Sequence, residues 1–333
     1  MAALAGDKTC WVLTVGIPGM DNQSMGLARE LANLNSMRVV EKRIRPTFPW
    51  KHLPPELWLF PLRCLGADSD PLEPPWPDVV IGTGRQTIAP GAAIRRASGG
   101  RTFSIHIHHP GAVGGRFDLV LVPEHDRLRG ANVVTYRGGL NVPARETLDA
   151  AAARFAPNFD ALLAPRVAVL VGGSNRCYAM TPEWAKGLAA QLRRMAEAAG
   201  ASMLFTPSRR TDPAVIDVLR RELEGLPVWF WDGNGENPYP AILALADAFV
   251  VTADSTNMVS EACSTGRPVL VAQMPGGSGK FLEFHRGMRE AGFTRDFEGL
   301  LETWSYAPLN DVPAVAERVL TCLRKSATTH LVS

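Results

Sequence analysis

A chain of 333 residues that is 46% hydrophobic and 20% charged is long enough for two domains and too apolar to be disordered. Its formal net charge of +2, with no basic tail, argues against nucleic acid as a partner. Five scattered cysteines without a C-x-x-C pair argue against a disulfide framework or a zinc site. With no apolar run of membrane-spanning length and no signal segment, we expect a cytoplasmic protein.

The first half of the chain alternates apolar runs with helical patterns. Strands that are apolar throughout are typical of parallel sheets covered by helices on both faces. We therefore predict a doubly wound α/β sheet in this half. Its strands are expected at 10–15, 38–44, 78–82, 101–107 and 118–122, and its helices at 24–34 and 86–98.

A proline-rich segment between Pro46 and Pro77 differs from the rest of this half because it carries several large aromatic side chains. Its stretch from Trp50 to Leu62 is flanked by basic residues, as are interfacial segments that meet anionic lipid. Two interpretations stay open. Either these side chains fill the core of the first domain, or they make peripheral contact with a membrane, here the inner membrane.

Polar residues follow the strands of the first half, where an open α/β sheet binds ligands. Any of Glu124, His125 and Asp126 suits a base that deprotonates an acceptor hydroxyl, and a plain charged turn is the alternative. The nearby histidines lack a carboxylate or cysteine spaced to complete a metal site, so we expect no metal. The residues assigned to the acceptor side are Gly19, Asn22, Gln23, Arg85 and Gln86.

The second half alternates more cleanly, as βαβ units do. The chain is therefore predicted to form two Rossmann-like doubly wound domains, 1–158 and 165–305, that face each other across a cleft. A linker is expected near 155–165, and a final helix at 311–326 can pack back on the first domain. Strands of the second half are predicted at 166–171, 202–206, 228–231, 248–252 and 268–272, and helices at 182–199, 213–224, 238–246 and 256–265.

A glycine turn, Gly172 and Gly173, follows the first strand of the second half, with Arg176 just beyond it. Glycines allow backbone to approach a ligand closely, although most such turns are structural. The chain contains no dinucleotide fingerprint and no P-loop, so we expect no nicotinamide cofactor and no P-loop chemistry.

Two further loops of the second half carry polar candidates. Ser208, Arg209 and Arg210 directly follow a strand, and paired arginines can hold a phosphate through charge-assisted hydrogen bonds. Asn237 lies in a polar loop that can hold a nucleobase through backbone groups. For both loops a solvated turn is the alternative.

The stretch from Asp247 to Pro268 is the most informative part of the chain. It predicts a buried strand, a helix capped by Ser255, and a new strand. A helix that starts just after a strand directs its unpaired N–H groups at the position where a diphosphate binds, next to Asn257. Glu261 lies less than two turns further on and can accept ribose hydroxyl protons. An ordinary capped helix is the alternative.

Seven stretches together resemble the mitochondrial-fission "elongated mitochondria" family, in its bacterial type, over almost the whole chain. The resemblance implies a GT-B fold like that of the peptidoglycan N-acetylglucosaminyltransferase, with a nucleotide-sugar crevice and no structural metal. One departure is His108-His109-Pro110, where the family has a polar stretch. The matching stretches are Gly19–Leu27, Val80–Arg85, Val122–Asp126, Gly172–Arg176, Ser208–Thr211, Gly235–Tyr239 and Asp254–Ala262.

These observations favour a metal-independent glycosyltransferase that takes a nucleotide-diphospho-sugar, UDP-linked, to an envelope or lipid-linked acceptor. The rival interpretation is a non-catalytic adaptor that keeps the fold and recruits a protein partner, since function resides in sites and not in folds. A short-chain nucleotide-sugar epimerase is disfavoured because the chain has neither its dinucleotide fingerprint nor a Tyr-x-x-x-Lys.

Overall fold

The computed structural model describes residues 8–332, and their side chains as far as Ser326. The chain forms two compact units, each built on its own sheet. The first unit comprises Met1–Asn141 together with Asn310–Ser333, and the second is the continuous stretch Val142–Leu309.

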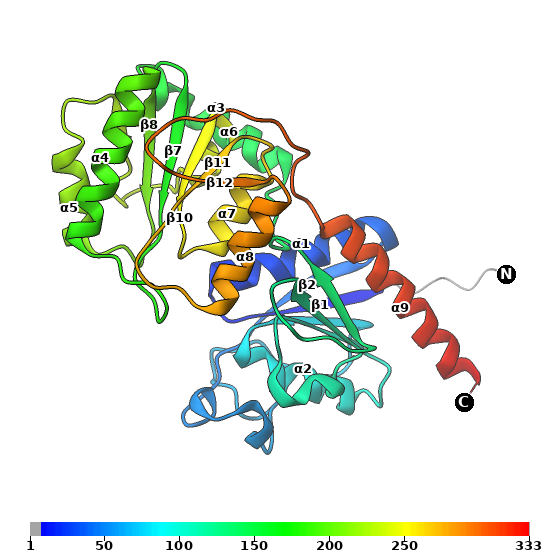
Figure 1. The fold of residues 1–333 in the computed structure, drawn as a ribbon. Helices are drawn as coiled ribbons and strands as arrows, with labels where there is room; N and C mark the ends of the chain where they lie inside the picture. Colours follow the sequence, from blue (N-terminus) through cyan, green and yellow to red (C-terminus); the bar gives the residue numbers. More distant parts are fainter. Residues whose placement is uncertain (1–7, 333) are drawn as a thin grey trace. The chain divides into compact units, whose positions relative to one another are not determined.

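The first unit is a parallel six-stranded sheet in the order β2-β1-β3-β4-β5-β6. Helices α1 and α9 pack together on one side of the sheet, and α2 lies on the other side (Figure 1). Its elements are β1 (Thr9–Thr14), α1 (Pro18–Asn35), β2 (Arg38–Arg43), η1 (Trp50–His52), η2 (Pro55–Leu57), β3 (Val79–Thr83), α2 (Arg85–Ala97), β4 (Phe103–Ile107), η3 (Gly111–Arg116), β5 (Leu119–Pro123), β6 (Val133–Tyr136) and α9 (Val312–Val332).

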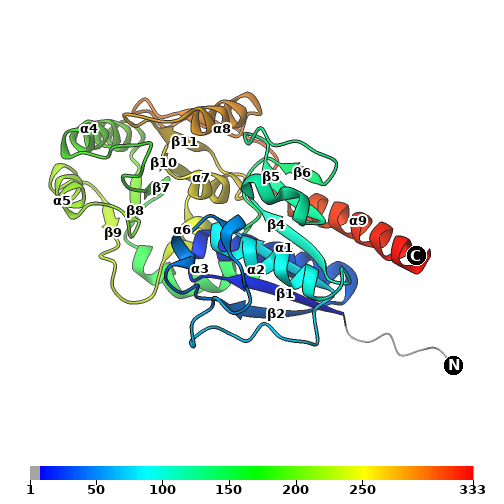
Figure 2. The same ribbon diagram turned by 90° about the horizontal axis from the view of Figure 1, so that it is seen from below.

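The second unit repeats this plan with the strand order β12-β11-β10-β7-β8-β9, again all parallel. Helices α4 and α5 pack together on one side of the sheet and α3 and α6 on the other (Figures 1 and 2). Its elements are α3 (Arg145–Phe159), β7 (Arg166–Val171), α4 (Pro182–Ala199), β8 (Ser202–Pro207), α5 (Pro213–Glu222), β9 (Val228–Phe230), α6 (Tyr239–Leu245), β10 (Ala248–Thr252), α7 (Thr256–Cys263), β11 (Val269–Ala272), α8 (Gly279–Glu290) and β12 (Thr294–Asp296).

Continuous apolar strands explain both sheets. Every residue of β10 is buried, as are five of the six residues of β7, because helices cover these central strands on both faces. One large apolar core runs through the second unit, and the central strands β1, β3 and β4 of the first unit are buried as well. The predicted fold class, two Rossmann-like α/β sheets, is confirmed.

The expected linker near 155–165 is wrong, because helix α3 occupies Arg145–Phe159 and packs against α6. Phe159 is fully buried, and its ring lies edge-on to that of Trp229, with the ring centroids 5.0 Å apart. Pro157 sits inside the last turn of α3, so the proline does not mark a loop here. As a result, the second unit begins at Val142 and not near residue 165.

The final helix belongs to the first unit, where α9 contacts α1 and β6. Val315, Ala316 and Val319 form its buried stripe. Among the helices of residues 8–332, none is both long and apolar enough to cross a membrane.

Phe159→Ala is expected to lower the free energy of unfolding by about 3–5 kcal/mol, because it removes a fully buried ring from the core of the second unit. Asn158→Ala, at the exposed neighbouring position, is the control and is expected to change it by less than about 0.5 kcal/mol. Urea denaturation of both variants measures the difference. Equal, small effects would contradict the packing of α3.

Candidate functional site

The strand order of the second sheet reverses between β7 and β10. From β7 the chain continues outward to β8 and β9, and from β10 it continues in the opposite direction to β11 and β12. Open α/β sheets bind ligands beyond the carboxyl ends of the strands at such a reversal. Gly172 follows β7 and Asp254 follows β10, so their loops form this position.

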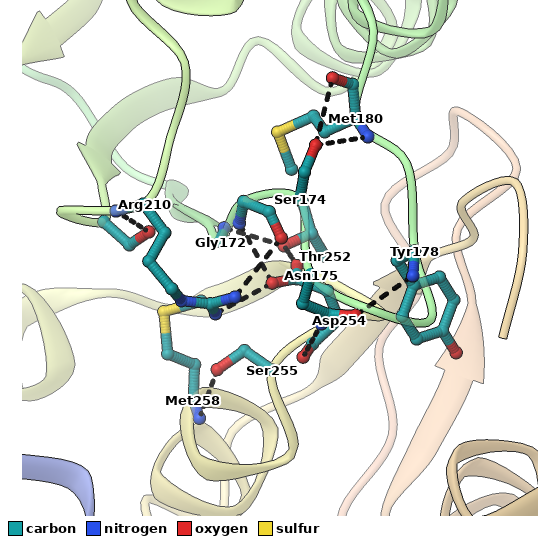
Figure 3. A network of polar contacts seen from close by, with 12 residues as sticks. Gly172, Ser174, Asn175, Tyr178, Met180, Arg210, Thr252, Asp254, Ser255 and Met258 are labelled. Atoms are coloured by element: carbon teal, nitrogen blue, oxygen red, sulfur yellow. Dashed lines mark hydrogen bonds and ion pairs between the residues drawn. The ribbon is translucent and has the colours of Figure 1, made fainter. Parts of the chain in front are cut away.

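Asp254 is the centre of a polar network at this position (Figure 3). Its side chain is completely buried, and its carboxylate accepts hydrogen bonds from the Gly173 N–H at 2.9 Å and the Thr252 hydroxyl at 2.6 Å. The Arg210 guanidinium forms an ion pair with it at 3.0 Å. Thr252 also accepts the N–H of Gly172 at 2.8 Å. The ends of β7 and β10 and the loop after β8 are thereby joined by one carboxylate.

Gly172 and Gly173 are required by the close packing of this network. A Cβ atom on Gly172 would collide with the Asp254 carboxylate, and one on Gly173 would collide with the Arg210 backbone. The carbonyl of Gly172 accepts a hydrogen bond from the Thr211 hydroxyl. Both glycines are buried, so the turn owes its composition to close packing of the three loops.

The two arginines of the loop after β8 have different positions. Arg210 is committed to Asp254 and donates a longer hydrogen bond, 3.4 Å, to the Gly173 carbonyl. Both arginine side chains are exposed, but Arg209 makes no ion pair with any residue that the structure describes. The sequence analysis expected both arginines to hold a phosphate. Arg209 alone keeps that expected role, because Arg210 is paired with Asp254 and supports the loop. Ser208 uses its hydroxyl within the same turn, where it accepts the Arg210 N–H at 3.1 Å.

Helix α7 begins as the sequence predicts, because the Ser255 hydroxyl accepts the Met258 N–H at 3.4 Å. Asn257 lies in the first turn, half-buried. The N-terminus of α7 therefore lies immediately beyond the Asp254 network, where its dipole favours an anion.

Glu261 is held by a neighbour that the sequence analysis did not identify. The Tyr239 hydroxyl at the start of α6 donates a hydrogen bond to the Glu261 carboxylate at 2.5 Å. Burial raises the pKa of Glu261 to about 7, and the hydrogen bond from Tyr239 offsets part of that rise. Burial also raises the pKa of Tyr239, so the phenol remains a donor. A half-ionised acid near neutral pH thus lies on the same helix as Ser255.

The remaining candidates of the second unit lie on the surface. Arg176 is exposed in the loop after β7. Asn237 is also exposed, and its side-chain oxygen accepts the Tyr239 N–H at 3.1 Å, so it shapes the turn into α6.

The first sheet reverses its order between β1 and β3, and the predicted acceptor-side residues lie at these two strand ends. Asn22 is exposed and Gln86 is half-buried. Gln23 is 2% exposed, donates to the Gly19 carbonyl at 3.0 Å and accepts from Tyr136, so it points into the interior of the unit. Arg85 donates to the backbone carbonyl of His52.

The three base candidates after β5 differ in their surroundings. Glu124 is exposed and forms an ion pair with Arg137 at 3.0 Å. Asp126 is buried, and its carboxylate accepts the Leu128 N–H at 3.2 Å, which closes the turn. His125 is half-buried beside them. Asp126 therefore fits a structural role better than that of a base.

His106 is the most deeply buried histidine of the first unit among the described side chains. His106 is fully buried against Phe117, and burial lowers its pKa to about 3, so the ring is neutral. In the part of the chain that the structure describes, no three histidine, cysteine or carboxylate side chains gather closely enough to hold a metal ion.

Two Rossmann-like parallel sheets, each reversing its strand order at a polar position, define the GT-B class of α/β folds. UDP-GlcNAc 2-epimerase from Methanocaldococcus jannaschii aligns with 95% of this chain and 99% of its own, at 12% identity and a TM-score of 0.60. In its complex with UDP-GlcNAc and UDP it aligns at a TM-score of 0.54. MurG from Acinetobacter baumannii aligns with 97% of this chain and 94% of its own, at 13% identity and a TM-score of 0.50.

The chain belongs to the family described as Mitochondrial fission ELM1, whose model matches residues 18–323. Mitochondrial fission protein ELM1 from Arabidopsis thaliana is 36% identical over 270 residues, which cover 73% of this chain and 63% of the plant protein. This chain thus spans less than two thirds of that relative's length. The uncharacterized protein RP120 from Rickettsia prowazekii is 23% identical over 94% of this chain and 98% of its own. The resemblance stated from the sequence is confirmed.

Arg210→Ala is expected to lower the free energy of unfolding by about 1–3 kcal/mol, because it removes the cation from a fully buried carboxylate. Arg209→Ala, at the equally exposed neighbour that makes no ion pair with a described residue, is the matched control and is expected to change it by less than about 0.5 kcal/mol. Denaturant midpoints of the unliganded variants decide this. If Arg209→Ala were the more destabilising change, the assignment of the two arginines would be reversed.

Glu261 gives the unliganded protein a stability that falls as pH rises. Its folded pKa of about 7 lies above the ordinary value of 4.5, so the folded state holds a proton that the unfolded state has lost between these values. This contribution is complete below about pH 4.5 and is lost as pH rises through about 7. Glu261→Gln is expected to flatten the pH dependence of the melting temperature in this window. An unchanged profile would contradict the raised pKa.

Proposed function

We propose that this chain is a metal-independent GT-B-type glycosyltransferase that binds a UDP-linked sugar in its second unit and transfers the sugar to an envelope acceptor. The observation that carries the proposal is one helix, α7, that starts at the strand-order reversal with Ser255 and bears Glu261 less than two turns later. An anion site and a hydroxyl-accepting carboxylate on one helix suit a nucleoside diphosphate.

In this proposal the diphosphate binds at the N-terminus of α7, next to Ser255 and Asn257. Arg209 supplies the cation, because Arg210 is already paired with Asp254. Fixed N–H groups and a fixed cation stabilise the negative charge that grows on the departing nucleoside diphosphate, and they do so without reorganisation.

Glu261 accepts the ribose hydroxyls, and Tyr239 holds its carboxylate in place. Asn237 shapes the turn before Tyr239, where backbone groups can contact the base. Gly172, Gly173 and Arg176 line the same strand ends. The donor of the proposed reaction is a substrate, so no cofactor is part of it.

The acceptor is assigned to the first unit, with Glu124 or His125 as the base that removes the proton of its hydroxyl. Arg137 keeps the Glu124 carboxylate in position. Asp126 acts in this scheme through the turn that it closes.

The rival proposal is a non-catalytic adaptor, and the plant relative's name, Mitochondrial fission protein ELM1, favours it. A third candidate function comes from the solved structures, because a UDP-GlcNAc 2-epimerase shares this fold. Assays in solution distinguish these three candidate functions. An adaptor leaves UDP-sugars unbound, an epimerase converts UDP-GlcNAc without an acceptor, and a transferase releases UDP only when an acceptor is present.

UDP is expected to raise the melting temperature of the protein, because a ligand that binds only the folded state stabilises it. Arg209→Ala is expected to weaken UDP binding by about 1.5–3 kcal/mol, the value of a charge-assisted hydrogen bond, and to leave uridine binding unchanged. Arg221→Ala, an exposed arginine on α5 that pairs with Glu222, is the control. Calorimetric titration of both ligands measures the difference.

Two results would count against the donor site. Equal losses for UDP and uridine would show that Arg209 does not contact phosphate. If none of UDP, GDP, CDP and ADP shifts the melting temperature at about millimolar concentration, the transferase proposal fails and the adaptor is favoured.

A further inference from the structure

The segment after β2 concentrates exposed apolar side chains. Of the nine large apolar side chains exposed among residues 8–326, four lie within thirteen consecutive residues of this segment. They are Phe48 at 79% exposure, Leu57 at 56%, Leu59 at 71% and Phe60 at 64%.

These side chains are held outward by a buried inner face of the same segment. Trp58 is 7% exposed and packs with Cys64 and Ala89, and its indole N–H donates to the Leu53 carbonyl at 3.3 Å. Leu59 and Phe60 follow Trp58 directly, and both are exposed to solvent. The first interpretation from the sequence, that side chains of this segment fill the core, holds for Trp58, whereas Leu59 and Phe60 stay exposed.

The segment lies beside helix α2 in the first unit (Figure 1). Two grooves run between the segment and this helix. Their volumes are about 820 Å³ and 290 Å³. Leu59 and Arg96 line both grooves, Phe60 and Arg63 line the smaller one, and Arg116 lines the larger one. Apolar and basic side chains therefore occupy one continuous surface.

Exposed arginines without ion-pair partners give this surface a positive charge. Arg63, Arg96 and Arg116 are exposed and make no ion pair within the residues that the structure describes, whereas Arg95 is occupied by Asp118 at 2.8 Å. The one carboxylate that lines the grooves is Glu56. Unpaired arginines around projecting leucine and phenylalanine side chains match a surface that offers both anionic groups and hydrocarbon.

We propose that this surface, centred on Leu59, Phe60, Arg63 and Arg96, docks the first unit onto an anionic lipid membrane. Leu59 and Phe60 enter the interface between headgroups and acyl chains, and the arginines contact the headgroup phosphates. Insertion of the apolar side chains and attraction of the arginines to the headgroups are each weak, so reversible binding requires both together. The surface lies wholly in the first unit, so this proposal stands independently of the nucleotide site.

The test is co-sedimentation with phosphatidylcholine vesicles that contain phosphatidylglycerol, beside pure phosphatidylcholine vesicles and a vesicle-free sample. Wild type is expected to pellet with the anionic vesicles only. Leu59→Ser/Phe60→Ser is expected to lower the partition coefficient by about tenfold or more. Arg63→Gln/Arg96→Gln is expected to lower it by about fivefold for each charge removed.

Matched controls separate docking from general surface changes. Leu163→Ser/Leu282→Ser removes equally exposed leucines of the second unit, and Arg29→Gln/Arg38→Gln removes exposed arginines elsewhere in the first unit. Both are expected to bind as wild type does. Because the arginine variants change only exposed side chains, they keep the test valid if the apolar variant fails to fold.

Three results would overturn the proposal. In the first, the wild type stays in the supernatant with anionic vesicles at low salt. In the second, Leu59→Ser/Phe60→Ser and Arg63→Gln/Arg96→Gln bind as tightly as their controls. In the third, sedimentation velocity shows that Leu59→Ser/Phe60→Ser breaks a dimer of the wild type, which would make the surface an interface between two copies.

Discussion

The buried carboxylate of Asp254 is the constraint on which the second unit's candidate site depends. A carboxylate without partners in the interior costs several kcal/mol, so its partners must all be present at once. They are a backbone N–H after β7, a hydroxyl at the end of β10 and a guanidinium after β8. This single requirement fixes three loops relative to one another. It also accounts for the two glycines, since larger residues would displace the carboxylate or the arginine loop.

The first unit joins its loops at the reversal mostly through neutral groups. At its reversal the hydroxyls of Ser24 on α1 and Thr83 at the end of β3 lie 2.5 Å apart, and Gln23 bonds within the interior. Asp21 accepts the Val15 N–H at 3.1 Å and fixes the loop after β1. The same sheet topology thus supports a buried ion pair at the junction of one unit and mostly neutral hydrogen bonds at that of the other.

The sequence predicts best what is local. Strand β10, the Ser255 cap and the Asp212 cap of α5 follow from apolar runs and capping residues within a few positions. Helix α3 is missed because prolines near its end resemble a linker, while its reason to fold is the packing of Phe159 on a distant strand. The Arg210–Asp254 pair spans 44 positions, and nothing local distinguishes Arg210 from Arg209. The polar end of a buried strand was the available signal for Asp254.

The division of the chain has a consequence for its synthesis. The second unit is one uninterrupted stretch, Val142–Leu309, set inside the first, whose last element is α9. On the ribosome the inserted unit can finish folding as soon as its own residues emerge. The contacts between α1 and α9 cannot form until the chain beyond Leu309 has been translated. The unit that starts first therefore finishes last, and a ribosome that stalls before Val312 would leave an incomplete first unit attached to a complete second one.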